Sequence, residues 1–276
     1  MLNLVARLMV KVKVYILTWR DATALNNNLR TLFEGFTHLS EKFNPRIDVN
    51  VINNHTEIEI HEKYGSHVNV IHNRAQPDFA TAMLARMWNL ALIHGFRDLK
   101  NPDCDIVVTA QDDTVWNHDW IIQLLKVMSK FDFYADDAGD MVCAYRADAV
   151  KKIGLWDERF HYGFGEGDYF LRAIKYLPEK SSINDFAHGR VWNPSLHLAQ
   201  RPEPDTTRYA EQSRSHRFRS LSWANFLYKW KHTEMEGRWP DEIQEMILQS
   251  ETVPSTILYP YFELDVENLQ EKGYIV

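Results

Sequence analysis

Hydrophobic and polar positions along the first two-thirds of the chain alternate between strand-like and helix-like patterns. Short apolar, β-branched runs bounded by polar residues predict buried strands over Lys13–Thr18, Ile47–Ile52, Val68–Ile71 and Ile106–Thr109. Between these runs apolar residues recur at spacings of three and four, which predicts one helix opened by Asp21 and another from Pro77 to Phe96. Gly95 is the predicted stop of the second helix.

Strands that alternate with helices predict an α/β fold, with a mostly parallel sheet covered by helices on both faces. Ligands bind such sheets at the carboxyl ends of the strands. The residues that follow three of the predicted strands should therefore line one cleft: Thr18-Trp19-Arg20, Asn53-Asn54 and Gln111-Asp112-Asp113.

The composition changes after about Pro202. The segment from Arg201 to Arg219 is polar and rich in arginine, which predicts either a mobile lid that clamps a diphosphate or a solvated basic face. Helices are predicted over Trp223–Trp230 and Asp241–Leu248. We therefore expect one domain over residues 1–200, with a lid-like loop and a C-terminal helical extension over 201–276 packed on the same domain.

Composition and charge narrow the function class. The 276 residues are 45% hydrophobic, which excludes a largely disordered chain, and the net charge of −7 argues against general nucleic-acid binding. Two cysteines are too few for a disulfide framework or a cysteine-rich zinc site. The apolar start is interrupted by Arg7, Lys11 and Lys13, and no apolar window is long enough to span a membrane, so we expect a soluble, cytoplasmic protein.

Two adjacent carboxylates, Asp112 and Asp113, follow the fourth predicted strand. Such a pair is costly unless a positive group neutralises it, and oxygen ligands suit Mg²⁺ or Mn²⁺ bridging a diphosphate. The alternative is that the pair caps the helix that begins near Asp119.

A glycine-rich segment, GLWDERFHYGFGEGDYFLR, runs from Gly154 to Arg172. Three glycines within five positions allow a tight turn and a close approach to a ligand. A cap on the following short helix, with a salt bridge to Arg172, would explain Asp168. It does not explain Glu166, whose carboxylate in a glycine- and aromatic-walled loop suits a general base.

The acidic pair, followed about fifty residues later by WDERFHYGFGEGDYFLR, resembles the nucleotide-sugar-dependent glycosyltransferases of GT-A fold. The resemblance covers roughly residues 12–200. It is closest to the inverting family 2 type, with a motif similar to the C-terminal segment of the beta-galactosyltransferases. It implies a GT-A (Rossmann-like) fold, a nucleoside diphosphate sugar donor, an Mn²⁺ or Mg²⁺ ion and a glycan acceptor.

The resemblance also implies roles for individual residues. Glu166 matches the catalytic base and Asp113 a metal ligand. Gln111 stands where many members have the first Asp of the acidic motif, and Asn53 stands where an Asp contacts uracil; UDP is favoured, with GDP or dTDP as alternatives. The residues assigned to donor binding are Thr18, Trp19, Arg20, Asn53, Arg86, Gln111 and Asp112, and those assigned to the acceptor are Trp156, Tyr162, Gly165 and Asp168.

A third metal ligand in this family is often a histidine at the end of a later strand. His188 and His197 both qualify, and His197 is favoured because it lies just before the polar segment; a structural hydrogen bond is the alternative for either. The aromatic residues of the region suit stacking on sugar rings or burial in the core: Trp156, Tyr162, Phe164 and Trp192.

The activity implied is inverting transfer of a sugar from a nucleoside diphosphate to a glycan hydroxyl. One alternative is a non-catalytic descendant that binds glycans or nucleotide sugars. The other is a sugar nucleotidyltransferase, which would carry a glycine-rich loop after the first strand, where this chain has LTWRDATALNNN.

Overall fold

The computed structural model describes residues 10–19, 21–38, 45–54, 58–73, 84–136, 141–160, 164–184, 196–200 and 216–231, with the side chains of the last segment described from residue 221 on. Its strands are β1 (Lys11–Thr18), β2 (Arg46–Asn53), β3 (Val68–His72), β4 (Ile106–Gln111), β5 (Val115–Trp116), β6 (Phe133–Ala135), β7 (Val142–Tyr145), β8 (Ser181–Ile183) and β9 (Ala199–Gln200). Its helices are α1 (Ala22–Glu34), the 3-10 helix η1 (Gly35–His38), α2 (Glu62–Gly65), α3 (Leu84–Phe96), α4 (Trp120–Met128), α5 (Ala147–Ile153), α6 (Gly165–Tyr176) and α8 (His216–Lys229).

Seven of the strands form one sheet in the order β3-β2-β1-β4-β7-β6-β8. β7 is antiparallel to both of its neighbours, and the remaining neighbours are parallel. The prediction of a mostly parallel sheet is therefore confirmed, and the four predicted strands end within two residues of β1, β2, β3 and β4. β5 and β9 form a separate antiparallel pair.

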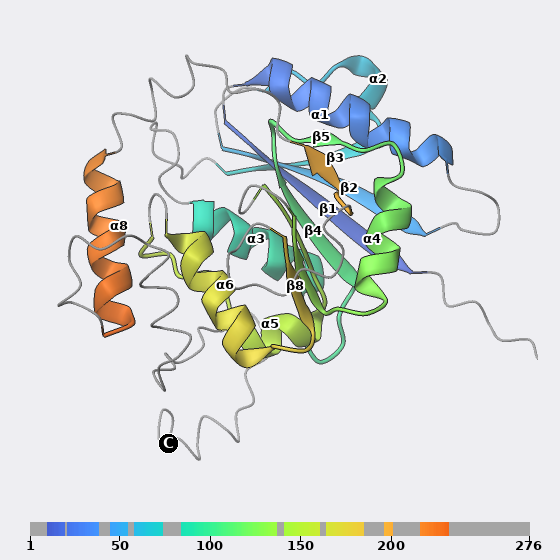
Figure 1. Ribbon diagram of the computed structural model, residues 1–276. Coiled ribbons are helices and arrows are strands. Elements are labelled where there is room, and N and C mark those ends of the chain that lie inside the picture. Colours follow the sequence, from blue (N-terminus) through green and yellow to red (C-terminus); the bar gives the residue numbers. More distant parts are fainter. Residues whose placement is uncertain are drawn as a thin grey trace, which may run out of the picture.

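Helices cover both faces of the large sheet, as predicted (Figure 1). Successive residues of β1 enter different cores: Val12 and Val14 pack on the side of α1 and α4, whereas Tyr15 and Leu17 pack on the side of α3, α5 and α6. Burial on both faces explains why the central strands are almost continuously apolar. Asp21 caps α1, as predicted, by accepting a hydrogen bond from the Ala24 N–H at 2.8 Å.

Gly95 does not end its helix, which corrects the sequence prediction. It lies within the last turn of α3, and the described part of this helix ends at Phe96. A Cβ atom at position 95 would lie 2.5 Å from Cγ2 of Val107 on β4. The missing side chain therefore allows close packing of α3 on the sheet, and Arg97, with a φ of 61°, takes the left-handed conformation after the helix.

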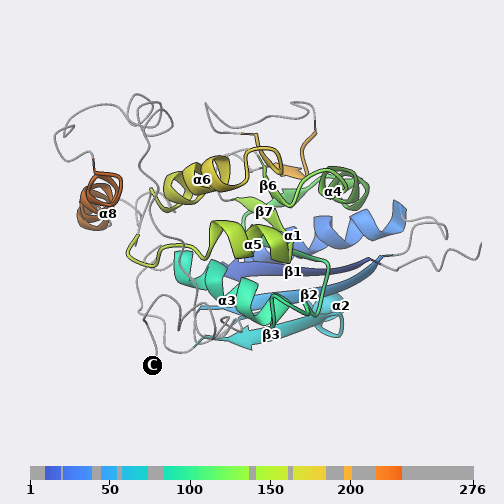
Figure 2. The same cartoon turned by 90° about the horizontal axis from the view of Figure 1, so that it is seen from below.

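Helix α8, the last helix in the described part of the chain, lies beside α6, on the side away from the sheet, in both views (Figures 1 and 2). It covers residues 223–229 of the predicted helix 223–230 but begins at His216. Arg217 and Arg219 of the expected lid therefore belong to a helix, while residues 201–215 and the predicted helix 241–248 lie outside the described residues. Among the helices that the structure describes, none is both long and apolar enough to cross a membrane.

Candidate functional site at the carboxyl edge of the sheet

The carboxyl ends of β1, β2 and β4 meet at one edge of the sheet. Thr18 lies beside Asn53 in the parallel register of β1 and β2. The Asn54 N–H donates to the Thr18 carbonyl at 3.1 Å, and the Trp19 N–H donates to Asp112 Oδ2 at 3.3 Å. The described residues of the three segments therefore lie together at one edge; that they line a cleft stays a prediction.

The acidic pair lies in a tight turn directly after β4. The Thr114 N–H donates to the Gln111 carbonyl at 3.2 Å, and the same carbonyl accepts from the side chain of buried Asn28 at 2.8 Å. Asp112 is buried, and Asp113 is half-buried. The helix-capping alternative is excluded, because α4 begins after Asp119 without any side-chain cap.

The other residues assigned to the donor differ in how far they are buried. Asn53 is buried, and its Nδ2 lies 3.4 Å from Nδ1 of His72 on β3, so an amide stands at the edge where a base could be bound. Trp19 is half-buried and Arg86 is exposed on α3. Arg20 lies outside the described residues, as do Tyr162, His188 and Trp192.

Asp136, which follows β6, is a fully buried carboxylate that holds the segment before β9. It accepts hydrogen bonds from the Leu198 N–H at 2.6 Å, the Ala199 N–H at 3.0 Å and the Tyr134 hydroxyl at 2.9 Å. Its Oδ1 also lies 3.1 Å from Nδ1 of His197. A carboxylate at Nδ1 orients a histidine so that Nε2 can face a ligand.

The register of the β5–β9 pair separates His197 from the acidic turn. Val115 pairs with Gln200 and Trp116 with Ala199, so His197 lies beside Asn117, whose Nδ2 donates to the His197 carbonyl at 2.7 Å. Within the described part of the chain, no three His, Cys, Asp or Glu side chains gather closely enough to hold a metal ion. The metal role of His197 therefore stays a prediction.

Glu166 lies in the first turn of α6, which begins at Gly165. The sequence predicted that Glu166 and Asp168 precede this helix, and that prediction is wrong: both residues lie inside it. The N-cap is Phe164, which has a left-handed φ of 61°. Because β8 follows α6 closely and runs parallel to β6, the N-terminus of α6 lies toward the carboxyl edge of the sheet. Glu166 is half-buried.

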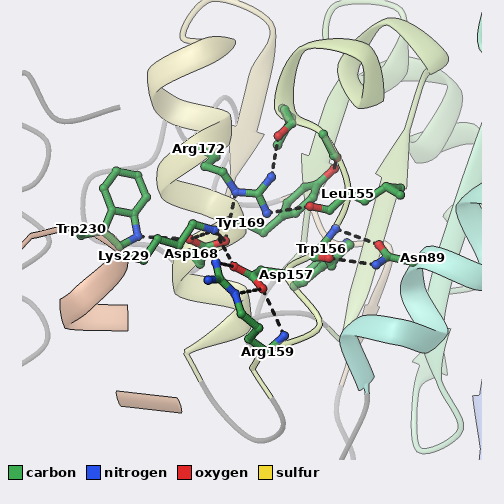
Figure 3. A network of polar contacts seen from close by, with 12 residues as sticks. Asn89, Leu155, Trp156, Asp157, Arg159, Asp168, Tyr169, Arg172, Lys229 and Trp230 are labelled. Carbon is green, nitrogen blue, oxygen red and sulfur yellow. Dashed lines mark hydrogen bonds and ion pairs between the residues drawn. The ribbon is translucent and has the colours of Figure 1, made fainter. Parts of the chain in front are cut away.

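Trp156 and Asp168, which the resemblance assigned to the acceptor, lie in the interior. Trp156 is 1% exposed and stacks on Tyr169 with ring centroids 4.4 Å apart, so the structure gives it the core position that was the alternative for aromatic residues. Asp168 is fully buried and forms the predicted salt bridge with Arg172, at 3.0 Å (Figure 3). Neither side chain presents a surface on which an acceptor could lie.

The Asp168–Arg172 pair belongs to a larger network that the sequence did not predict. Arg172 also donates to the carbonyls of Ile153 at 2.5 Å and Leu155 at 2.9 Å. From α8, Lys229 Nζ lies 2.7 Å from Asp168 Oδ1, and the indole N–H of Trp230, just after α8, donates to Asp168 at 3.1 Å. No local pattern indicates contacts between residues about sixty positions apart.

Asp157 is the second carboxylate of this network. It is bound by Arg159 at 2.5 Å and by Lys229 at 3.0 Å. Burial alone would raise the pKa of the Asp157 carboxyl, but the hydrogen bonds from Arg159 and the charge and hydrogen bond of Lys229 outweigh it and hold this pKa well below its usual value. The carboxylate is therefore ionised in the folded protein at neutral pH.

Comparisons with known proteins identify the fold. No family model matches the chain, and no curated protein matches its sequence. S. aureus TarS, residues 1–349, has a similar structure, with a TM-score of 0.52 at 12% identity over 87% of this chain and 69% of that one. The TarS structure with the longer chain gives 0.50 at 11% identity, and there this chain spans 42% of the neighbour. A third neighbour is the mannosyltransferase PcManGT from Pyrobaculum calidifontis, solved with GDP-Man and Mn²⁺, with a TM-score of 0.46, 11% identity, and coverage of 95% of this chain and 79% of that one. The chain thus has a mixed α/β fold that matches the fold of TarS.

Proposed function

We propose that the protein is a metal-dependent inverting glycosyltransferase that moves a sugar from a nucleoside diphosphate to a hydroxyl of a glycan. The observation that carries the proposal is the convergence of Thr18, Asn53 and Asp112 at one edge of the sheet. The first turn of α6, with Glu166, lies toward the same edge. Buried polar groups at this edge are the ordinary means by which such a sheet binds a ligand.

The donor is proposed to lie across the carboxyl ends of β1, β2 and β4. Asn53 would hydrogen-bond the base, and an amide suits more than one base edge, so UDP is favoured with GDP or dTDP as alternatives. The acidic turn would lie at the ribose and diphosphate. The proposed donor-binding residues are Thr18, Trp19, Arg20, Asn53, Arg86, Gln111 and Asp112.

Asp113 is the proposed ligand of an Mn²⁺ or Mg²⁺ ion, with His197 as the candidate second protein ligand. Carboxylate and imidazole donors suit Mn²⁺, and the contact between Asp136 and His197 Nδ1 supports a ligating Nε2. With at most two protein ligands, the remaining positions around the ion would be filled by oxygen atoms of the donor and by water. Such an ion would supply positive charge that stabilises the leaving diphosphate.

Glu166 is the proposed general base. Its carboxylate would take the proton from the attacking hydroxyl of the acceptor, the hydroxyl oxygen would form a bond to the anomeric carbon, and the bond from that carbon to the diphosphate would break. Attack on the face opposite the leaving group inverts the configuration, by the geometry that also governs inverting hydrolysis. A positioned base contributes roughly 10²- to 10⁴-fold to the rate.

The acceptor is proposed to bind near the loop before α6. Tyr162 remains the candidate side chain there, because Trp156 and Asp168 are buried; Gly165, which is also buried, would offer only its backbone. We also propose that residues 201–276 form an extension of the domain of residues 1–200. The contacts of Lys229 and Trp230 with Asp168 support this arrangement for α8.

A non-catalytic protein that binds nucleotide sugars is the second candidate, favoured by Asn53 and Gln111 at positions where the resembled family carries acidic residues. It predicts donor binding without turnover. A sugar nucleotidyltransferase is less well supported, because the residues after β1 lead directly into α1 and carry no glycine.

A thermal-shift panel of UDP, GDP and dTDP, each with and without Mn²⁺, tests the donor site. A ligand at 100 times its Kd adds about 2.7 kcal/mol, or roughly 5–10 °C at this size. We expect one diphosphate to raise the Tm when Mn²⁺ is present, and Asp113→Asn to abolish that shift. Asp148→Asn, an exposed carboxylate on α5, is the control and should leave it unchanged. No shift with any diphosphate would contradict the proposal.

A further inference from the structure

We infer that α8 positions the proposed base. Lys229 and Trp230 bind Asp168 in the first turn of α6, as Figure 3 shows. Trp223 packs against Phe164, the residue that begins α6. These are positioning residues, which act on Glu166 through other side chains. The inference rests on the proposed role of Glu166. If α8 positions Glu166, the C-terminal extension contributes to the rate of transfer.

The ionic contact reaches the turn that carries Glu166. Asp168 lies two residues after Glu166, and its N–H closes the first turn of α6 by donating to the Phe164 carbonyl at 2.9 Å. Its carboxylate receives Arg172 from α6 itself, and Lys229 and Trp230 from the end of α8. A shift of α8 therefore acts directly on this turn.

The buried charges of the network balance only when α8 is in place. Asp157 and Asp168 are buried carboxylates, and Arg172 and Lys229 are their buried cations. Arg159 adds a contact to Asp157 from a side chain that is 60% exposed. Without Lys229, Asp157 would retain only this exposed partner, and a buried carboxylate with one exposed cation is poorly held.

An aromatic contact holds the residue that begins the helix. Phe164 takes a left-handed φ of 61°, a conformation that costs energy for any residue other than glycine and persists only when its surroundings enforce it. Its ring packs against Trp223 with centroids 4.8 Å apart and against Phe226 at 6.0 Å. Both partners belong to α8, so the same helix enforces the entry into α6.

The packing between the two helices is close enough to fix their positions. Phe226, Leu227 and Trp230 form a buried cluster with Phe160 and Leu171. A Cβ atom added at Gly167, between Glu166 and Asp168, would lie 3.7 Å from the Phe226 ring. The first turn of α6 therefore rests against α8 by apolar as well as ionic contacts.

Lys229→Met tests the inference in the full-length protein. With Mn²⁺ and the sugar nucleotide whose diphosphate gives the thermal shift, we expect kcat to fall about 100-fold, the cost of an error of about 1 Å in the position of a catalytic group. KM for the donor should stay within about twofold, because the donor residues lie on other elements. Lys229→Arg should recover most of the lost rate. Lys151→Met, an exposed lysine on α5, is the matched control.

The background of Glu166→Gln separates positioning from general damage. If Lys229 acts through Glu166, Lys229→Met should cause no further loss of rate in that background, because residues that act as a unit are not additive. An equal loss in both backgrounds would overturn the inference, as would a kcat of Lys229→Met near that of the parent protein. Retained turnover of Glu166→Gln alone would instead overturn the proposed base.

Amide hydrogen exchange provides a readout that needs no substrate. We expect the Asp168 amide, which closes the first turn of α6, to exchange faster in Lys229→Met, while amides of β1 and β4 stay protected. Unchanged exchange at Asp168 would overturn the inference whatever the activity of the variant.

Discussion

Two ion pairs within the described helices have the same spacing and differ most clearly in burial, which allows one prediction to be worked out closely. Asp168–Arg172 and Arg30–Glu34 both join residues four apart on a helix, at 3.0 and 2.8 Å. The first pair is fully buried, whereas the side chains of the second are 50% and 56% exposed. Replacing each arginine by methionine removes the charge and keeps much of the side-chain volume.

Arg172→Met should destabilise the protein strongly. Removing one partner of a buried pair costs about 3–5 kcal/mol, because the other charge remains buried without its counter-ion. The carbonyls of Ile153 and Leu155 also lose their donor, which adds to this cost, although Lys229 and Trp230 still bind Asp168 and reduce it. We therefore expect a loss of roughly 3–5 kcal/mol.

Urea unfolding followed by tryptophan fluorescence measures this loss, and a thermal scan should show a decrease in Tm of roughly 6–20 °C. Arg30→Met, the matched control, should cost only about 0.3–0.5 kcal/mol, as exposed pairs at this spacing do. If Arg172→Met costs no more than Arg30→Met, burial does not determine the strength of this network, and the reasoning is wrong.

Three further predictions follow from buried groups. Because the pKa of Asp157 is lower in the folded than in the unfolded protein, where it is near 4, its ionised form stabilises the fold above about pH 4, and this stabilisation is lost as the pH falls further. Asp157→Asn should therefore flatten the acid side of a plot of unfolding free energy against pH. Gly95→Ala should destabilise by about 1–3 kcal/mol in urea, since the added methyl meets Val107, and a gain in stability from helix propensity would refute the packing argument. Asp136→Ala should cost about 2–4 kcal/mol by leaving two backbone N–H groups unpaired, with faster amide exchange in the segment after His197; unchanged exchange there would contradict it.

The central strands and the meeting of their carboxyl ends could be predicted because their signals are local. β1, β2 and β4 are apolar runs long enough to be recognised, and parallel pairing brings their carboxyl ends together whatever the loops do. β6, β7 and β8 have three or four residues each, too few for a periodic signal, so the antiparallel reversal at β7 was not predicted.

The errors near α6 arise from tertiary contacts. The helix begins after Phe164, a residue type that no capping rule selects, because aromatic side chains of α8 hold it in the left-handed conformation. Asp168 has the pattern of a cap, but its partners Lys229 and Trp230 lie about sixty positions further along the chain. Gly95 has the pattern of a helix stop, and its actual role depends on Val107 of another element.

The turnover of Glu166→Gln tests the central claim most directly. The assay measures release of nucleoside diphosphate from UDP-, GDP- and dTDP-sugars with Mn²⁺ and a panel of glycan acceptors, next to Glu62→Gln, an exposed first-turn glutamate of α2, as the control. We predict that Glu166→Gln lowers the rate by roughly 10²- to 10⁴-fold while the thermal shift with the diphosphate and Mn²⁺ is kept. A parent protein that turns over, together with a Glu166→Gln variant that does so equally fast, would contradict the account.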